Sequence, residues 1–354
     1  MAGALVAMMI MASPAAASKS HGPTSTSVAA LPRAWILVDA DRGVVLDAGN
    51  DRQPMPPASL TKLLTALIAT TQLTPTDTLT VSDRAAGEPA SKINMKTGQV
   101  WNVQDSLHAL LLSSANDAAI ALAERTAGSL EGFAVAMQQA AGQLGLQDNP
   151  ILRDPAGLDD NFSVDGGNLL SARDLAIIAR AALAQPLVAE VVATPVYSFV
   201  GPDGAHHRLG NHNQLLKTYP GAIGMKTGYT AKSGEDLIGA ARRGGRTMIA
   251  VVMGAPNIYR NASALLDEGF ASPATSAGTG DVLPARSLPQ PPVLAPSAPP
   301  PGPSPQPSVS VTPHHDTGPN RILLVLGLIM LAGTILTSMR RRQVSRRRTT
   351  RRSR

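Results

Sequence analysis

Hydrophobic residues between positions 30 and 270 follow strand-like spacing at both ends and helical spacing in between. Two short apolar runs, 35–38 and 44–46, flank the polar segment 39–43, which predicts a β-hairpin. Strand-like runs return near the end of this region, at residues 224–229, 236–242 and 247–254. The last two runs are joined across Gly244 and Gly245, which predicts a second hairpin.

Helical spacing begins close to Ser59. The apolar face of this predicted helix consists of Leu60, Leu63, Leu64, Leu67 and Ile68. Four further helices are predicted: one that ends near residue 112, one over 117–127, one that begins at about 172 and one over 259–269. A first hairpin, a block of helices and a final run of strands predict an α+β domain over residues 30–270, whose terminal strands share one sheet.

Composition changes after residue 270. Residues 271–320 hold 14 of the 29 prolines and few large apolar residues, so we expect a disordered linker. The next segment, 322–339, has no charge and would span about 27 Å as a helix, close to the ~30 Å hydrocarbon core of a bilayer. The sequence therefore predicts a single transmembrane helix after the linker.

The last fifteen residues, 340–354, contain nine arginines and no acidic residue. Their charge of +9 exceeds the net charge of +6, so residues 1–339 carry 6 − 9 = −3. A basic tail can indicate nucleic-acid binding, but directly after a transmembrane helix it favours a cytoplasmic tail. We therefore expect a single-pass protein of the cell membrane whose preceding domain is extracytoplasmic, with no nucleic-acid partner.

An apolar run at residues 4–12 is followed by an Ala-x-Ala site that ends at Ala17, which predicts a signal peptide over residues 1–17. The basic start of such signals is missing, because no lysine or arginine precedes Lys19. Either the signal is atypical or the start codon is assigned too late. The absence of cysteine fits an exported protein without disulfides.

Ser59 and Lys62 lie three residues apart on the first predicted helix, so both side chains project from one face. A serine hydroxyl becomes an effective nucleophile when a neighbouring base takes its proton, and a partly buried lysine without its proton can be that base. The alternative is a capping serine ahead of an ordinary surface lysine, which is the more frequent arrangement for an isolated Ser-x-x-Lys.

Ser114 and Asn116 occupy a polar break between two predicted helices, where side chains can point into a cleft. The hydroxyl can relay a proton, and the amide can bind a substrate carbonyl. The alternative is again a helix cap, with either residue starting the next helix. Alone, this Ser-x-Asn is a weak signal.

Lys226, Thr227 and Gly228 lie on a predicted strand, where a cation beside a hydroxyl suits a carboxylate and glycine allows close approach of a ligand. The same letters Met-Lys-Thr-Gly also occur at 95–98. Only the later copy precedes strand patterns, so we assign the binding role to Lys226 and expect Lys96 to be solvated. The seven histidines show no metal-ligand spacing, so neither a metal nor another cofactor is expected.

The order Ser-x-x-Lys, Ser-x-Asn, Lys-Thr-Gly is the triple signature of penicillin-binding proteins and serine β-lactamases. In this order and context the chain resembles the D-alanyl-D-alanine carboxypeptidases, the low-molecular-mass penicillin-binding proteins. The resembling segments are 57–66, 111–119, 154–158, 211–213 and 220–230. The resemblance implies an antiparallel sheet packed against helices, as in β-lactamases, with an active site between the edge strand and the helices.

The same resemblance implies that Ser59 is the acylated nucleophile, Lys62 its base and Ser114 a proton relay. The expected activity is removal of the terminal D-Ala from peptidoglycan stem peptides that end in D-Ala-D-Ala. β-Lactam antibiotics are the expected inhibitors.

Peptide binding is expected at Asn116 and along the strand that carries the third motif. Lys226 and Thr227 are expected near the terminal carboxylate of the peptide. The backbone N–H groups of Ser59 and Tyr229 are expected to form the oxyanion hole.

Other functions share the same motifs. A serine β-lactamase must deacylate rapidly, and class A enzymes use a glutamate for that step; no Glu-x-x-Leu-Asn segment lies between Asn116 and Lys226. A transpeptidase of the same fold remains an alternative. A non-catalytic penicillin sensor or wall-binding module would be indicated by the loss of a motif residue, and none is lost.

Overall fold

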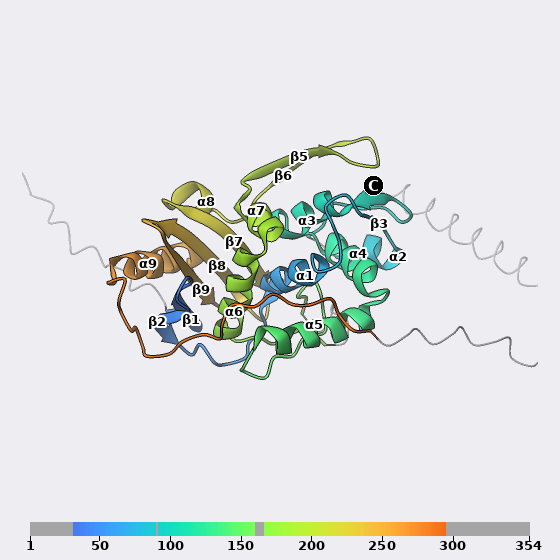
Figure 1. Cartoon of the computed structure of the whole chain (residues 1–354). Coiled ribbons are helices and arrows are strands. Elements are labelled where there is room, and N and C mark those ends of the chain that lie inside the picture. The colour runs from blue at the N-terminus through green and yellow to red at the C-terminus, as the bar shows by residue number, and fades with distance from the viewer. Residues whose placement is uncertain (1–30, 90, 160–165, 295–354) are drawn as a thin grey trace, which may run out of the picture. The chain divides into compact units, whose positions relative to one another are not determined.

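One sheet contains the strands from both ends of the folded region. The computed structural model describes residues 31–89, 91–159 and 166–294 (Figure 1). Five antiparallel strands lie in the order β2-β1-β9-β8-β7. Their bounds are β1 Ala34–Asp39, β2 Val44–Gly49, β7 Ala222–Thr230, β8 Gly234–Arg243 and β9 Arg246–Met253. Both predicted hairpins, and the prediction that the terminal strands share one sheet, are therefore confirmed.

The chain between β2 and β7 forms a mainly helical block. A 3-10 turn, η1, leads into the buried helix α1, around which α3, α4, α5 and α6 are arranged (Figure 1). The helical elements of this block are η1 Ala58–Thr61, α1 Lys62–Ala69, α2 Asp83–Gly87, α3 Val103–Leu112, α4 Asn116–Ala127, α5 Leu130–Leu144, α6 Ala172–Ala184 and α7 Pro186–Ala193. Two more, α8 Leu215–Thr218 and α9 Ile258–Ala271, pack against the opposite face of the sheet.

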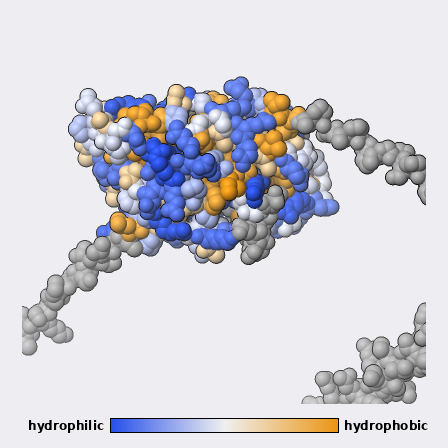
Figure 2. All heavy atoms as spheres, turned by 90° about the horizontal axis from the view of Figure 1, so that it is seen from below, coloured by the Kyte–Doolittle hydropathy of each residue, from blue (hydrophilic) through white to orange (hydrophobic). Residues whose placement is uncertain are grey.

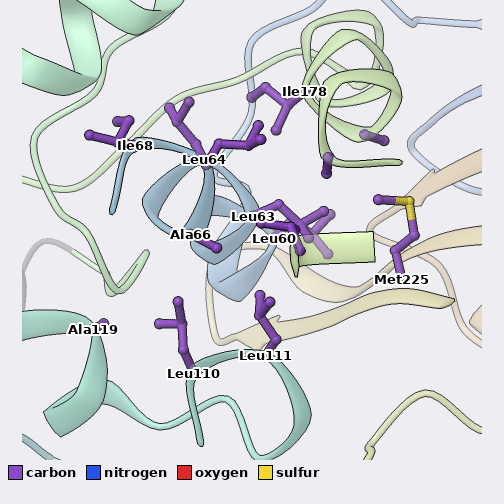
Figure 3. Packing of buried hydrophobic residues seen from close by; sticks show 14 of the residues in the cluster. Leu60, Leu63, Leu64, Ala66, Ile68, Leu110, Leu111, Ala119, Ile178 and Met225 are labelled. Atoms are coloured by element: carbon purple, nitrogen blue, oxygen red, sulfur yellow. The ribbon is translucent and has the colours of Figure 1, made fainter. Parts of the chain in front are cut away.

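The leucine-rich pattern after Ser59 produces a helix that is buried on every side. All eight residues of α1 are buried, and its apolar side chains meet Leu110 and Leu111 of α3, Ile178 of α6 and Met225 of β7 (Figure 3). Burying a leucine side chain contributes about 1.5–3 kcal/mol. Helix α1 therefore holds the first motif in a fixed position inside the core.

Two small sheets were not predicted from the sequence. Their strands are β3 Thr78–Thr80 with β4 Val100–Asn102, and β5 Val196–Val200 with β6 His206–Gly210. The β5–β6 hairpin projects above α3 in Figure 1. It carries the stacked rings of Phe199 and His207, which both meet Trp101 edge-on, and the ring of Tyr197 lies tilted beside Phe199. These strands depend on an aromatic contact with a distant part of the chain, which a local pattern does not reveal.

Several predicted segments lie outside the residues that the structure describes: the signal peptide 1–17, most of the linker, the transmembrane helix 322–339 and the basic tail 340–354. Within the described ranges, no single helix is long and apolar enough to cross a bilayer. The pair α6 and α7 passes that test only together and is bent by 102°. Figure 2 shows a mainly hydrophilic face with small separate hydrophobic areas.

The predicted start of the linker at residue 271 is wrong, because the described residues 272–294 lie on the folded domain. We call them the strap. The strap runs antiparallel beside the outer strand β2: Val45 N–H donates to Asp281 C=O at 3.0 Å, and Leu283 N–H donates to Gly43 C=O at 2.8 Å. A side chain at Gly278 would collide with the carbonyl of Val45. The strap therefore covers an otherwise unpaired sheet edge.

Side chains of the helical block also hold the strap. Arg173 forms ion pairs with both Asp51 and Asp281 at 2.7 Å. The Arg180 guanidinium donates to Pro284 C=O at 2.8 Å. The side chain of Gln139 exchanges two hydrogen bonds with the backbone of Val293. The proline-rich composition predicted an unfolded segment. The strap is nevertheless held on the domain by these polar contacts and by the buried side chain of Leu283.

A chain that ends at Ala271 should be less stable than one that ends at residue 294. Removing the strap exposes the edge of β2 and takes one partner each from the buried Arg173 and Arg180, which keep Asp51 and the Ala40 carbonyl, and we expect this to cost about 2–4 kcal/mol. For a domain of this size that corresponds to a fall in Tm of roughly 5–15 °C in a thermal melt. Equal Tm values for the two truncated chains would contradict the structural role of the strap.

Candidate active site

A cleft of about 490 Å³ opens between strand β7 and the helical block. Ser59 and Ser114 of the predicted site lie in its wall on the helical side, and Thr227, Gly228 and Tyr229 lie along β7. Its remaining lining residues are Ser91, His212, Gln214, Glu235, Ile258 and Tyr259. The three motifs, which are far apart in the sequence, therefore meet at one site.

Ser59 is placed by a strained turn. It belongs to η1, and the preceding Ala58 has a φ of 45°, a region that non-glycine residues rarely adopt. Gly157, at φ +74°, packs directly against this turn, since a Cβ there would collide with the carbonyl of Ala58. The close contact between η1 and Gly157 fixes the backbone that carries the nucleophile.

Lys62 is fully buried and its amine has three partners. Nζ lies 2.9 Å from Ser59 Oγ, 2.8 Å from Asn116 Oδ1 and 2.6 Å from the carbonyl oxygen of Ala156. An amide oxygen and a backbone carbonyl can only accept hydrogen bonds. A neutral amine therefore uses its two N–H groups for Asn116 and Ala156, and its lone pair faces the Ser59 hydroxyl.

Burial favours this neutral form of Lys62. Removal from water lowers the pKa of Lys62 to about 7, while the carboxylates of Asp154, Glu88 and Asp117 act in the opposite direction. Since a general base is most effective with a pKa near the working pH, the amine suits deprotonation of Ser59 at neutral pH.

The carbonyl of Ala156 is held in place by Asp154. One carboxylate oxygen of Asp154 accepts hydrogen bonds from the backbone N–H of Ala156 at 2.7 Å and of Gly157 at 2.6 Å. The Thr65 hydroxyl of α1 donates to Pro155 C=O at 2.7 Å. The segment 154–158 thus forms a tight turn that presents an acceptor to Lys62, a role that the sequence did not reveal.

Ser114 and Lys226 form a second serine–lysine pair. Lys226 Nζ donates to Ser114 Oγ at 3.0 Å and to the carbonyl of Thr227 at 2.9 Å. Ser114 lies in the predicted break between α3 and α4 and has a φ of 60°, which indicates local strain. Burial, and secondarily the positive charge of Lys62, lowers the pKa of Lys226 well below its usual value.

Asn116 begins α4, and its side chain is occupied on both sides. Oδ1 accepts from Lys62, and Nδ2 donates to the carbonyl of Pro89 at 3.1 Å. The residue is 3% exposed and does not belong to the lining of the cleft. In this structure Asn116 therefore orients Lys62, whereas its contact with a substrate stays a prediction.

Strand β7 passes close to the nucleophile. A Cβ on Gly228 would lie 3.2 Å from the backbone nitrogen of Ser59, so only glycine fits without movement of one backbone. Tyr229, the next residue, is 70% exposed at the mouth of the cleft. This approach brings the two backbone segments of the predicted oxyanion hole, at Ser59 and Tyr229, side by side.

The two copies of Met-Lys-Thr-Gly have different environments. Lys226 is 1% exposed beside Ser114. Lys96 lies ahead of β4 and is exposed, as predicted. Lys226 therefore lies at the site and Lys96 does not, but the amine of Lys226 contacts Ser114 and does not line the cleft as expected. The substrate-binding role of Lys226 stays a prediction. In the described ranges, no group of three or more His, Asp or Glu side chains could hold a metal ion.

Comparisons with known proteins agree with this geometry. The family model of the S11 peptidases, described as D-alanyl-D-alanine carboxypeptidase, matches residues 19–257. D-alanyl-D-alanine carboxypeptidase DacB2 of Mycobacterium tuberculosis is 35% identical over 252 residues, which are 69% of this chain and 84% of that protein. DacF of Bacillus subtilis, with the same enzyme name, is 32% identical, and the match covers 70% of this chain and 64% of DacF.

Two solved structures show the same fold. The D-alanyl-D-alanine carboxypeptidase from Mycobacterium tuberculosis H37Rv has a TM-score of 0.65 at 33% identity, covering 69% of this chain and 93% of that one. Penicillin-binding protein D2 from Listeria monocytogenes, solved with ampicillin bound, has a TM-score of 0.59 at 29% identity, covering 68% and 97%. The motifs, the sheet and helices that bring them together, and these likenesses lead to one conclusion: the chain belongs to the D-alanyl-D-alanine carboxypeptidase family.

Proposed function

We propose that this protein is a serine D-alanyl-D-alanine carboxypeptidase that removes the terminal D-Ala from peptidoglycan stem peptides. The proposal rests chiefly on the amine of Lys62, which lies 2.9 Å from the Ser59 hydroxyl. The amine is held by the amide oxygen of Asn116 and the carbonyl oxygen of Ala156, which can only accept hydrogen bonds. This arrangement directs a lone pair at the serine proton, which is the requirement for an activated nucleophile.

In the first step Lys62 takes the Ser59 proton, and Oγ forms a bond to the carbonyl carbon of the penultimate D-Ala. The carbonyl oxygen becomes negative, and the backbone N–H groups of Ser59 and Tyr229 stabilise it. The C–N bond to the last D-Ala then breaks. The departing nitrogen needs one proton, which the Ser114 hydroxyl delivers, and the ammonium form of Lys226, with Nζ 3.0 Å from Ser114 Oγ, replaces that proton and becomes a neutral amine. Loss of this charge is favoured once Lys62 has become charged.

Water completes the reaction. It attacks the ester carbonyl of the acyl-enzyme and gives one proton through Ser114 to the amine of Lys226, which regains its charge. The bond to Ser59 Oγ breaks, Ser59 recovers its proton from Lys62, and the second proton of the water passes to solvent. The shortened peptide leaves with a new carboxylate. No step requires a metal or a cofactor. A β-lactam would follow the same first step, but its leaving nitrogen stays tethered to the acyl group, which supports its role as an inhibitor.

The rival functions differ in what they release. A carboxypeptidase releases D-Ala from an acyl-D-Ala-D-Ala peptide, and penicillin inhibits that release. A β-lactamase would hydrolyse many equivalents of penicillin and release little D-Ala, and a sensor would bind penicillin without either turnover. Measurement of D-Ala release and penicillin hydrolysis by the same preparation therefore tests the proposal, and penicillin hydrolysis without D-Ala release would overturn it.

We further propose that residues 322–339 anchor the protein in the cell membrane, with the catalytic domain extracytoplasmic and the arginine tail 340–354 cytoplasmic. The apolar span and the +9 charge that follows it support this topology. In intact cells from which any outer barrier has been removed, an added protease should digest the catalytic domain. A domain that stays protected until the membrane itself is broken would contradict the topology.

A further inference from the structure

Three buried carboxylates act on the amine of Lys62. They belong to Asp154, to Glu88 at the C-cap of α2 and to Asp117 in the first turn of α4. Burial lowers the pKa of Lys62 to about 7, and these three negative charges act in the opposite direction. On the side of β7, the pKa of Lys226 is lowered by burial and then by the charge of Lys62. The steps of the proposed reaction assign no part to the three carboxylate charges.

Two of these carboxylates have structural hydrogen bonds. Asp154 accepts from two backbone N–H groups of the turn that it closes, at 2.6 and 2.7 Å. Asp117 accepts from the backbone N–H groups of Ile93 at 3.3 Å and Met95 at 3.0 Å. Glu88 differs, because its Oε2 is buried and has no hydrogen-bond partner among the residues that the structure describes. Its charge can therefore be removed with less effect on the backbone.

The carboxylate of Glu88 depends on cations for its charge. The side chain is 2% exposed, and an ionised carboxylate is unfavourable in such surroundings unless cations compensate it. Oε1 pairs with Nε of the half-exposed Arg84 at 3.0 Å. Burial raises the pKa of Glu88; Arg84 and the ammonium form of Lys62 lower it, whereas Asp154 and Asp117 raise it. The charges of Glu88 and Lys62 thus stabilise each other.

The chain at Glu88 also holds the amide that orients the base. Lys92 Nζ donates to the carbonyl of Glu88 at 2.7 Å. The next carbonyl along the chain, that of Pro89, accepts from Asn116 Nδ2 at 3.1 Å. Asn116 Oδ1 in turn contacts Lys62 Nζ at 2.8 Å. The same stretch of chain therefore supplies the charged neighbour of Lys62 and fixes its neutral partner.

We propose that Glu88 is a positioning residue of the reaction, whose carboxylate stabilises the ammonium that forms when Lys62 takes the proton of Ser59. The inference rests on the proposed carboxypeptidase activity. The proton moves from Ser59 Oγ to Lys62 Nζ as Oγ bonds to the acyl carbon, so a new positive charge appears in a buried site. A carboxylate that is already in place stabilises this charge without rearrangement. Glu88 acts through Lys62, since it does not line the cleft.

The variant Glu88→Gln removes the charge and keeps the size of the side chain. The rate of acylation of the full-length protein by a fluorescent penicillin is measured between pH 5 and 9. Because the carboxylate favours the ammonium, its loss should lower the pKa of Lys62 and move the half-maximal rate to lower pH by about half a unit to one unit. The rate on the alkaline plateau should fall by about three- to tenfold, because the ammonium is less stabilised.

Two further variants separate the charge from the shape of the side chain. Glu88→Asp keeps the carboxylate and should keep the wild-type pH midpoint. Asp83→Asn removes an exposed carboxylate from the same helix, and as the matched control it should change neither the midpoint nor the plateau. The midpoint reports only the molecules that react, so a partial loss of folded protein does not move it. Thermal melts of all three variants record any loss of stability.

The outcomes separate this role from the activity. A lower plateau with an unchanged midpoint in Glu88→Gln would mean a merely structural role and overturn the inference, as would an unchanged profile; in both cases the carboxypeptidase function would stand. If the wild-type protein neither reacts with penicillin nor releases D-Ala, the function and the inference are both overturned. A midpoint that falls in Glu88→Gln and is kept in Glu88→Asp and Asp83→Asn would establish the inference.

Discussion

Lys62→Ala should slow the acylation of Ser59 by penicillin by about a hundredfold or more, while the domain stays folded. The expected size is that of a lost, well-positioned general base. Among the residues that the structure describes, the amine of Lys62 is the basic group that contacts the Ser59 hydroxyl, at 2.9 Å. Stopped-flow or fluorescent-penicillin labelling gives the rate. Lys62→Met, which keeps the length but cannot accept a proton, should be equally slow.

The pH dependence of the wild-type rate is part of the same prediction. Burial lowers the pKa of Lys62 to about 7, and the base must be neutral to act. Acylation should therefore be fast above about pH 8 and fall about tenfold per pH unit well below 7, as the protonated fraction of Lys62 grows. A flat profile between pH 5 and 8, or a Lys62→Met rate close to that of the wild type, would contradict the assignment.

Lys226→Ala should lower kcat/KM for D-Ala release by roughly ten- to hundredfold, the effect of about 1.5–3 kcal/mol for a lost charge-assisted contact. In the structure the amine supports Ser114 Oγ at 3.0 Å, so the loss should affect proton transfer as well as binding. The exposed Lys96, in the second copy of Met-Lys-Thr-Gly, is the matched control.

Lys96→Ala should change kcat/KM by less than about twofold, as expected for a solvated surface charge. Far-ultraviolet circular dichroism and Tm of both variants separate a lost contact from a lost fold. Equal losses in the two variants, or a larger loss in Lys96→Ala, would mean that the wrong copy was assigned to the site.

Much of the fold follows from local pattern, because the strands and helices near the site have clear periodicity. Leu60, Leu63 and Leu64 recur at helical spacing and form the buried face of α1, which fixes the position of the Ser59–Lys62 pair. The order of the three motifs predicted that Ser114 and Lys226 would join this pair. The structure then shows that Lys62 contacts Ser59 and that Lys226 contacts Ser114.

What the sequence did not reveal depends on contacts between distant backbone groups. The Ala156 carbonyl that orients Lys62 contributes no side chain, so no residue type marks its role. Asn116 is recognisable as a motif residue, but its orientation toward Lys62 and away from the cleft depends on the loop at Pro89. The strap has a disordered composition, yet partners 154 and 240 residues earlier, at Gln139 and Gly43, hold it.

The central claim is that Ser59 is the nucleophile, and the site of the penicilloyl group tests it most directly. The full-length protein is incubated with benzylpenicillin, digested and analysed by tandem mass spectrometry, with Ser59→Ala as the control. We expect one penicilloyl group per chain, on the peptide that contains Ser59, and none in Ser59→Ala. An adduct on Ser114 or any other residue, or undiminished labelling of a folded Ser59→Ala protein, would contradict the account.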